Sequence, residues 1–205
     1  MRIGIMGGTF DPPHLGHVLP VEEAAGQYRL DRVWYIPNSV PPHKSRQDLT
    51  DPYHRAAMVA LAIQRHPAFL LNTLELGQDL AAYTFDTIRK LREGEGRGHR
   101  LYFILGTDSF LEIDTWHRYP ELIDMCEFII INRGDTEEEL KQNLNRLEVT
   151  LQKNLAKTFH FSRTTIVPVS SSEVRAALSE GRSVSGLVSP EVEEYIRKHS
   201  LYQRR

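Results

Sequence analysis

The residues best suited to chemistry lie near the N-terminus, in the run Gly7-Gly8-Thr9-Phe10-Asp11-Pro12-Pro13-His14-Leu15-Gly16-His17. Glycines have no Cβ, so they allow the backbone to approach a polyanion closely. Amides at the start of a helix offer donors and a positive dipole end to phosphate. His14 and His17 are three residues apart, so they share a face of a first helical turn, and each can donate an N–H to a phosphate oxygen. The run predicts a phosphate-binding site.

The alternative interpretation of this run is structural, with the glycines in a tight turn and the histidines on a helix surface. The spacing matches neither the GxGxxG pattern of dinucleotide-binding enzymes nor the GxxxxGK[ST] pattern of P-loop enzymes. Pro20 removes the helical hydrogen bond to the carbonyl of Gly16, so we expect a kink or an irregular first turn there.

A second run, Ser170-Ser171-Ser172-Glu173-Val174-Arg175, stands where we expect the last strand to lead into a helix. Serines at that point can cap the helix and present hydroxyls and amides to phosphate. Arg175, one turn further on, can form a fork with two phosphate oxygens. Serine-capped helices with an arginine are common, so this run alone is a weak indication. With the first run, it predicts one anion pocket at the ends of the first and last strands.

The two runs resemble the (G)xFDPxHxGH and ISSTxxR signatures of the nucleotidylyltransferase superfamily, with Ser172 in place of the usual threonine. The resemblance implies that His14, His17 and Arg175 are the catalytic residues. It also implies a set of ATP-binding residues in these runs: Gly7, Gly8, Thr9, Phe10, His14, His17, Ser170, Ser171 and Arg175. His14 and His17 would bind the ATP phosphates, and Ser171 and Arg175 would hold the departing β/γ end.

Three further strings resemble the bacterial nicotinate mononucleotide adenylyltransferases. Pro41-Pro42-His43-Lys44 is similar to a PPHK loop, and Tyr83-Thr84-Phe85-Asp86-Thr87 matches a YTxDT string. Gly106-Thr107-Asp108, followed by Trp116, is similar to a GxD element followed by a tryptophan.

The resemblance implies a role for one residue in each part of the acceptor site. Lys44 would meet the acceptor phosphate, and Thr84, at the start of a helix, would bind the nicotinate carboxylate. Asp108 would accept a hydrogen bond from a ribose hydroxyl and would belong to both the acceptor site and the ATP site, and Gly106 would belong to the ATP site. Trp116 would offer a flat face to a cationic pyridine ring of the acceptor. Structural roles are the alternatives: a solvated loop charge for Lys44, an N-cap for Thr84 and a core position for Trp116.

The implied reaction transfers AMP from ATP to the phosphate of nicotinate mononucleotide, giving nicotinate adenine dinucleotide and pyrophosphate. We expect Mg²⁺ to be held mainly by substrate phosphates and water, with no metal ligands from the protein. Phosphopantetheine or nicotinamide mononucleotide is the alternative acceptor. A non-catalytic nucleotide sensor is the alternative of another class, and it would be expected to lack one of the phosphate-binding histidines or the late arginine.

Short apolar runs alternate with amphipathic stretches throughout, which predicts a Rossmann-like α/β fold with a doubly wound parallel sheet. We expect one domain over residues 1–205, with a helical C-terminal portion from about residue 170. The predicted strands lie near Arg2–Met6, Val33–Pro37, Phe69–Leu74, Leu101–Leu105, Glu127–Ile131 and Thr165–Val169. The predicted helices lie near Leu15–Tyr28, Pro52–Arg65, Thr84–Arg92, Glu121–Met125, Glu137–Lys157, Glu173–Ser179 and Pro190–Lys198.

Composition narrows the possible partners. The 205 residues include 25 basic and 27 acidic side chains, for a formal charge of -2, so no long-range field favours nucleic acid or anionic membranes. Cys126 is the only cysteine, which excludes an intrachain disulfide and fits a reducing compartment. No apolar run approaches the ~20 residues that span a bilayer, so we expect a cytoplasmic protein without a membrane partner. The charged 135–157 stretch could pack on its own sheet or form a homo-oligomer contact.

Overall fold

The computed structural model describes residues 1–39, 49–77, 83–132 and 134–203. Its six strands form one sheet in the order β3-β2-β1-β4-β5-β6, and every neighbouring pair is parallel. The strands are β1 (Arg2–Gly8), β2 (Arg32–Pro37), β3 (Phe69–Leu71), β4 (Arg100–Gly106), β5 (Glu127–Ile131) and β6 (Phe159–Ser162). The predicted doubly wound parallel sheet is confirmed.

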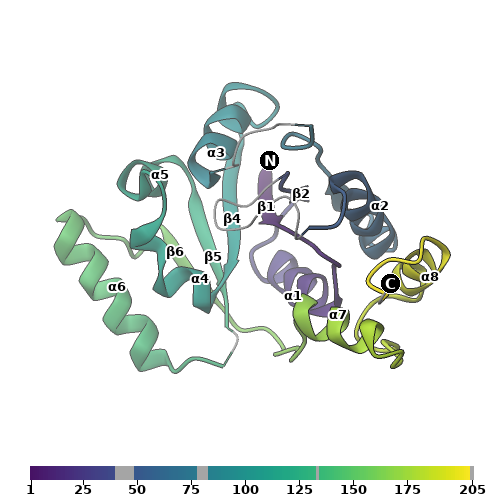
Figure 1. The fold of residues 1–205 in the computed structure, drawn as a ribbon. Coiled ribbons are helices and arrows are strands. Elements are labelled where there is room, and N and C mark those ends of the chain that lie inside the picture. The colour runs from purple at the N-terminus through teal and green to yellow at the C-terminus, as the bar shows by residue number, and fades with distance from the viewer. Residues whose placement is uncertain (40–48, 78–82, 133, 204–205) are drawn as a thin grey trace.

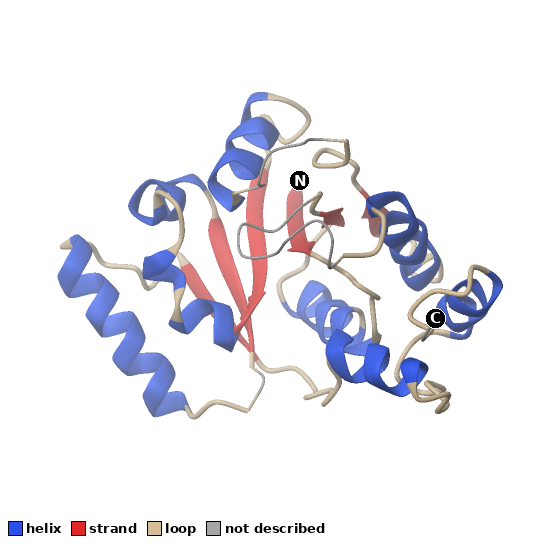
Figure 2. Cartoon of the chain, in the orientation of Figure 1, coloured by secondary structure: helices blue, strands red, loops and turns tan. Residues whose placement is uncertain are grey.

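Helices cover both faces of this sheet (Figures 1 and 2). On one face pack α3 (Thr84–Glu93), α4 (Thr107–Leu111), α5 (Tyr119–Met125) and α6 (Glu137–Leu151). On the other lie α1 (Leu19–Gln27) and α2 (Pro52–Ile63). A third apolar cluster joins α2 to two further helices, α7 (Ser171–Ser179) and α8 (Pro190–Lys198). No helix in the described ranges has both the length and the apolar character needed to cross a bilayer.

Alternation along the strands divides the core between the two faces. Ile3 and Ile5 of β1 are fully buried with the α3 side, whereas Met6 packs with the α1 side. Parallel strands covered on both faces read as nearly continuous apolar runs, as the predicted strands did.

The irregular start of the first helix is confirmed. A 3₁₀ turn, η1 (Leu15–His17), comes first, and α1 begins only at Leu19. Pro20 has no N–H to donate to the carbonyl of Gly16, so the helix cannot run without interruption from the turn into α1. This break leaves the two motif histidines on a separate short turn.

The predicted sixth strand at Thr165–Val169 is wrong. The strand that pairs with β5 is β6, which places Phe159 beside Phe128. Residues 165–169 are instead an irregular connection to α7 in which Pro168 has no N–H for a ladder, the amide of Val169 donates back to the carbonyl of Val167 at 2.9 Å, and Ile166 is 50% exposed. The β-branched composition of this segment suggested a strand, but its side chains line a cavity described below.

The charged helix α6 ends at Leu151 rather than at Lys157, because Gln152 takes a left-handed conformation with φ +52° and closes its last turn. Its apolar stripe packs on its own domain, where Leu140 and Leu147 are buried in the main core cluster. The predicted cap of the final helix is confirmed, because the Ser189 hydroxyl accepts the amide of Val192 at 3.3 Å.

Candidate functional site

The carboxyl ends of β1 and β4 lie side by side at the point where the chain switches from one half of the sheet to the other. Gly8 ends β1 and Gly106 ends β4. The crossover from β1 carries α1 on one face, and the crossover into β4 carries α3 on the opposite face. In open parallel sheets, ligands bind in the crevice at such a switch point.

Phe10 shapes the loop that follows β1. It takes a left-handed conformation with φ +50° and is 1% exposed. Its ring lies against Gly8, where an added Cβ would be 3.1 Å from the phenyl carbons, and its centroid is 5.1 Å from that of His17. Glycine at position 8 therefore makes room for the aromatic ring that supports His17.

The two motif histidines form a stacked pair. The ring centroids of His14 and His17 are 3.7 Å apart, with an angle of 29° between the planes. The backbone N–H of His14 donates to Nδ1 of His17 at 3.3 Å, and the amide of His17 donates to the carbonyl of His14 at 2.8 Å. From β2, the buried Tyr35 donates its hydroxyl to the carbonyl of His17 at 2.9 Å. The expectation that the two histidines share one face is confirmed.

Gly16 makes room beside this pair. An added Cβ would lie 3.1 Å from the His14 ring and 3.2 Å from Val169. A larger residue at position 16 would therefore displace either the imidazole or the connection to α7, which explains the small residue between the two histidines.

The first and last motifs meet, as predicted. Ser171 at the start of α7 donates its hydroxyl to the carbonyl of Pro12 at 2.8 Å. One turn later, Arg175 donates Nη1 to the carbonyl of Asp11 at 2.6 Å. The two motifs thus belong to one hydrogen-bonded structure, although far apart in sequence.

Ser170 is the N-cap of α7. Its hydroxyl accepts the amide of Glu173 at 3.2 Å, and its own amide donates to the Glu173 carboxylate at 2.7 Å. The first intrahelical bond runs from Val174 to Ser170, so the amides of Ser171 and Ser172 precede it at the positive end of the helix dipole.

A cavity of about 450 Å³, here called the His17 cavity, opens at the switch point. It collects six residues that the sequence assigned to the site. They are Gly7, Gly8, His17, Thr84, Gly106 and Trp116. Trp116 also packs edge-on against Phe103 with centroids 5.9 Å apart, so it is part of the core and of the cavity wall at once.

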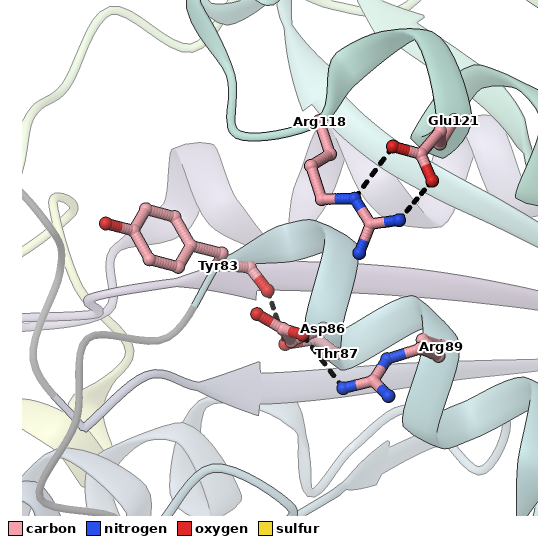
Figure 3. Close-up of polar contacts among 6 residues, drawn as sticks. All are labelled: Tyr83, Asp86, Thr87, Arg89, Arg118 and Glu121. Atoms are coloured by element: carbon pink, nitrogen blue, oxygen red, sulfur yellow. Dashed lines mark hydrogen bonds and ion pairs between the residues drawn. The ribbon is translucent and has the colours of Figure 1, made fainter.

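The beginning of α3 forms one side of this cavity. Figure 3 shows the polar contacts of Tyr83 and Thr87 at this helix start and of the neighbouring Arg118 and Glu121. Tyr83 is the N-cap and Thr84 the first helical residue, so the alternative of Thr84 as the N-cap is wrong. The backbone amide of Thr87 donates to the Tyr83 carbonyl at 3.1 Å. Arg118 at the start of α5 forms a fork with Glu121 and lies over the ring of Phe85, 3.9 Å from its centroid, so the start of α5 packs on the helix start that carries Thr84.

Glu75 is a site residue to which the sequence reading gave no role. Its side chain lines the His17 cavity but is 7% exposed, and its Oε1 accepts the Thr87 hydroxyl at 2.5 Å. Its Oε2 is buried without a hydrogen-bond partner among the described residues. Burial raises the pKa of this carboxyl, an effect that the Thr87 hydrogen bond and the charge of Lys90 oppose.

A second cavity of about 420 Å³, the His14 cavity, lies between the end of β5 and the segment leading to α7. His14 and Ser170 line it, and its other walls are mainly apolar. Among these wall residues are Ile131, Ile166, Val167 and Pro168. The stacked histidines therefore stand between two cavities, with one imidazole lining each.

Three of the remaining predicted residues have different outcomes. The Thr9 carbonyl accepts a hydrogen bond from Arg55. Asp108, the second residue of α4, is exposed and is not among the described residues that line either cavity. Lys44 lies outside the described residues. Asn132, directly after β5, also lines the His14 cavity.

Arg55 organises the surrounding loops, and the sequence reading missed it. Its side chain is 0% exposed and donates to four carbonyls at 2.6–2.9 Å. These carbonyls belong to Thr9, Asn38, Ser39 and Thr50. The available signal was its place on the buried stripe of α2, one turn before Val59, because an unpaired charge is seldom buried there.

Comparisons with known proteins agree with this arrangement. The family model described as Cytidylyltransferase-like matches residues 5–177. The chain is 36% identical over 205 residues to a Thermoanaerobacter sp. protein named "Probable nicotinate-nucleotide adenylyltransferase", covering 100% of this chain and 95% of that relative. It is 34% identical over 202 residues to the "Nicotinate-nucleotide adenylyltransferase" of Bacillus subtilis, covering 98% of each.

Solved structures show the same fold. The Plasmodium falciparum nicotinic acid mononucleotide adenylyltransferase complexed with NaAD matches with a TM-score of 0.78 at 23% identity, covering 98% of this chain and 97% of that one. Its complex with APC matches with a TM-score of 0.76 at 22% identity, covering 98% and 96%. The relatives therefore match nearly the whole of this chain, including the strand ends, the histidine pair and the serine-capped helix. The chain belongs to the nicotinate-nucleotide adenylyltransferase family, within the cytidylyltransferase-like group.

Proposed function

We propose that this chain transfers the AMP unit of ATP to the phosphate of nicotinate mononucleotide, giving nicotinate adenine dinucleotide and pyrophosphate. The observation that carries the proposal is the stacked histidine pair, with His14 lining one cavity and His17 the other. A transfer between two nucleotides needs two adjoining sites with phosphate-binding groups between them. Family membership supports the identity of both nucleotides.

The reaction needs no nucleophile from the protein. An oxygen of the acceptor phosphate attacks the α-phosphorus of ATP, the bond from that phosphorus to the oxygen bridging to the β-phosphorus breaks, and pyrophosphate leaves with the electron pair. The protein contributes alignment and charge stabilisation, which carry most of such a transfer. His17 and His14 donate N–H groups to the phosphates, and His17 acts on the charge that develops in the transition state.

On the ATP side, the His14 cavity takes the adenine, because most of the residues that line it are apolar and suit a flat base. The phosphates then extend past Gly7 and Gly8 towards α7. There the amide of Ser171, whose hydroxyl is held by the Pro12 carbonyl, and the guanidinium of Arg175 hold the β/γ end as it leaves.

On the acceptor side, the His17 cavity takes the nicotinate nucleotide. Thr84 and the amides at the start of α3 bind the pyridine carboxylate at the positive end of the helix dipole. Trp116 offers its ring to the cationic pyridine. Lys44 binds the acceptor phosphate, and Asp108 accepts from a ribose hydroxyl.

The Mg²⁺ ion that the reaction is expected to use would arrive bound to the phosphates of its substrate. Among the described residues, no three His, Cys, Asp or Glu side chains come together as a group that could hold a metal ion. The donors near the histidine pair are imidazoles, hydroxyls and amides, which suit phosphate oxygens. Phosphate oxygens and water would therefore hold the ion, which neutralises charge between the two polyanions.

A pyrophosphate-release assay tests the proposal. ATP and Mg²⁺ are supplied with nicotinate mononucleotide, nicotinamide mononucleotide or phosphopantetheine, with an acceptor-free control, and the dinucleotide product is identified by mass. We expect the fastest release with nicotinate mononucleotide, and competition between the two mononucleotides at equal concentration gives the preference. ATP binding without release across the panel would overturn the proposal in favour of a nucleotide sensor.

A further inference from the structure

Asp11 in the first motif is held by a residue near the C-terminus. Its side chain is 3% exposed, and its Oδ1 accepts the hydroxyl of Tyr202 at 2.6 Å. Its Oδ2 accepts the amide of Thr50, just before α2, at 3.4 Å. Its carbonyl accepts Nη1 of Arg175 at 2.6 Å. Three segments distant in sequence thus converge on one residue of the phosphate-binding loop.

The backbone after α8 takes an unusual path that brings Tyr202 to Asp11. After α8, Ser200 and Tyr202 both take left-handed conformations, with φ +50° and φ +61°, which non-glycine residues adopt only at a cost in free energy. In Figure 1 the yellow C-terminal end lies beside α8 and α2, on the side of the sheet that carries α7. The phenol reaches Asp11 from there, across 191 positions of sequence.

Charge makes this hydrogen bond a strong one. Burial raises the pKa of the Tyr202 phenol, and the neighbouring Asp11 carboxylate raises it further, so the group stays a donor throughout the working range of pH. An O–H group that donates to a carboxylate forms a short bond, stronger than one between neutral partners. Arg55 and Arg175 lie close enough to interact with the same pair electrostatically.

We propose that Tyr202 is a positioning residue for the AMP transfer: its hydroxyl fixes Asp11, and Asp11 fixes the turn that presents His14. The inference rests on the proposed function, because it assigns Tyr202 to that site. Only Pro12 and Pro13 separate Asp11 from His14. Their rings hold φ near one value, so a displacement at Asp11 passes to the imidazole with little loss. In-line transfer is sensitive to such displacements, of which 1 Å can cost about a hundredfold in rate.

Tyr202→Phe tests the inference, because it removes the hydroxyl and leaves the ring. Tyr195→Phe is the matched control: its hydroxyl lies 2.9 Å from Nδ1 of His54, on the same side of the molecule but away from the loop. We expect Tyr202→Phe to lower kcat at least about tenfold while KM for the acceptor changes much less. Tyr202→Phe should lose more thermal stability than Tyr195→Phe, because only the Tyr202 hydroxyl donates to a carboxylate, and both variants should remain folded at the assay temperature. A kcat near that of the wild type, or an equal loss in Tyr195→Phe, would overturn the inference.

Amide hydrogen exchange gives a second measurement that requires no acceptor. In Tyr202→Phe, exchange over residues 9–17 should accelerate relative to the wild type and to Tyr195→Phe, and unchanged exchange there would overturn the inference whatever the rate. In an Asp11→Asn background, Tyr202→Phe should have a smaller further effect, because the charged partner has gone. If the wild type releases no pyrophosphate with nicotinate mononucleotide, the proposed function fails, but exchange still decides whether Tyr202 orders the loop.

Discussion

Nδ1 of His17 accepts the backbone N–H of His14 at 3.3 Å while the two imidazoles stack. An accepting Nδ1 carries no proton, so the N–H of the neutral His17 ring is on Nε2. The contact therefore sets both the orientation of the ring and the nitrogen that donates. Because His14 lines one cavity and His17 the other, this single contact aligns the donors of the two nucleotide sites.

The first prediction concerns His17. His17→Ala should lower kcat about a hundredfold or more, because a preorganised donor to developing charge contributes about 3–4 kcal/mol to the barrier. Circular dichroism should show an intact fold. His66→Ala is the control, since His66 pairs with Glu22 and lines neither cavity among the described residues. A turnover near that of the wild type would remove His17 from the mechanism.

The second prediction concerns Arg175. Arg175→Lys keeps the charge but loses the planar fork that donates to the carbonyl of Asp11 and that, in the proposed function, holds the triphosphate end. A hydrogen bond to a charged group contributes about 1.5–3 kcal/mol, so kcat/KM for ATP should fall by about tenfold to a hundredfold. Steady-state kinetics with varied ATP measure the loss. Arg182→Lys, in an exposed pair with Glu180 after the same helix, should leave kcat/KM within about twofold, and an equal loss there contradicts the prediction.

The sheet, the strand ends and the convergence of the two motifs could be predicted from sequence because each has a local signal. Buried parallel strands appear as apolar runs, and the serine run marks a helix start whether or not the strand before it is placed correctly. The last strand was misplaced for the same reason. The 165–169 segment has a strand-like composition, but Pro168 and the pairing of Phe128 with Phe159 decide the ladder.

Long-range polar contacts have no such signal. Arg55 lies on a helix predicted correctly, but its four carbonyl partners lie in two loops, one after β1 and one between β2 and α2. The carboxylate of Glu75 is buried in the fold, where it accepts the hydroxyl of Thr87 from α3. The pairing of Tyr202 with Asp11 joins the two ends of the chain, and neither side chain alone indicates the other. The sequence therefore indicated the two motifs that converge, but not the polar contacts that hold them together.

The third prediction tests Arg55 as the support of those loops. Arg55→Met should lower the free energy of unfolding by about 3–5 kcal/mol, because it leaves buried carbonyls without donors and removes one of the two cations near Asp11. Urea unfolding followed by circular dichroism measures the change. Arg65→Met is the matched control, because that guanidinium is 76% exposed in its pair with Glu191 and should contribute less than about 1 kcal/mol. Similar losses in the two variants would contradict the prediction.

The fourth prediction uses the buried carboxyl of Glu75. Because burial raises its pKa above the ordinary 4.5, the folded protein binds this proton more tightly than the unfolded chain does. The protonated carboxyl makes its full contribution to the free energy of unfolding below pH 4.5, and that contribution is lost as pH rises through the pKa of the folded state. Glu75→Gln keeps an oxygen for the Thr87 hydroxyl and cannot ionise. It should match the wild type near about pH 4 and exceed it in unfolding free energy at about pH 7.

Urea unfolding at both pH values measures this difference for each protein. Each unit by which the folded pKa exceeds the unfolded value contributes about 1.4 kcal/mol to the gap once pH is above both. Glu112→Gln is the matched control, since Glu112 lines the same His17 cavity but is exposed. A gap between Glu75→Gln and the wild type that stays constant from acid to neutral pH, or that grows equally for Glu112→Gln, would show that burial of Glu75 does not govern its ionisation.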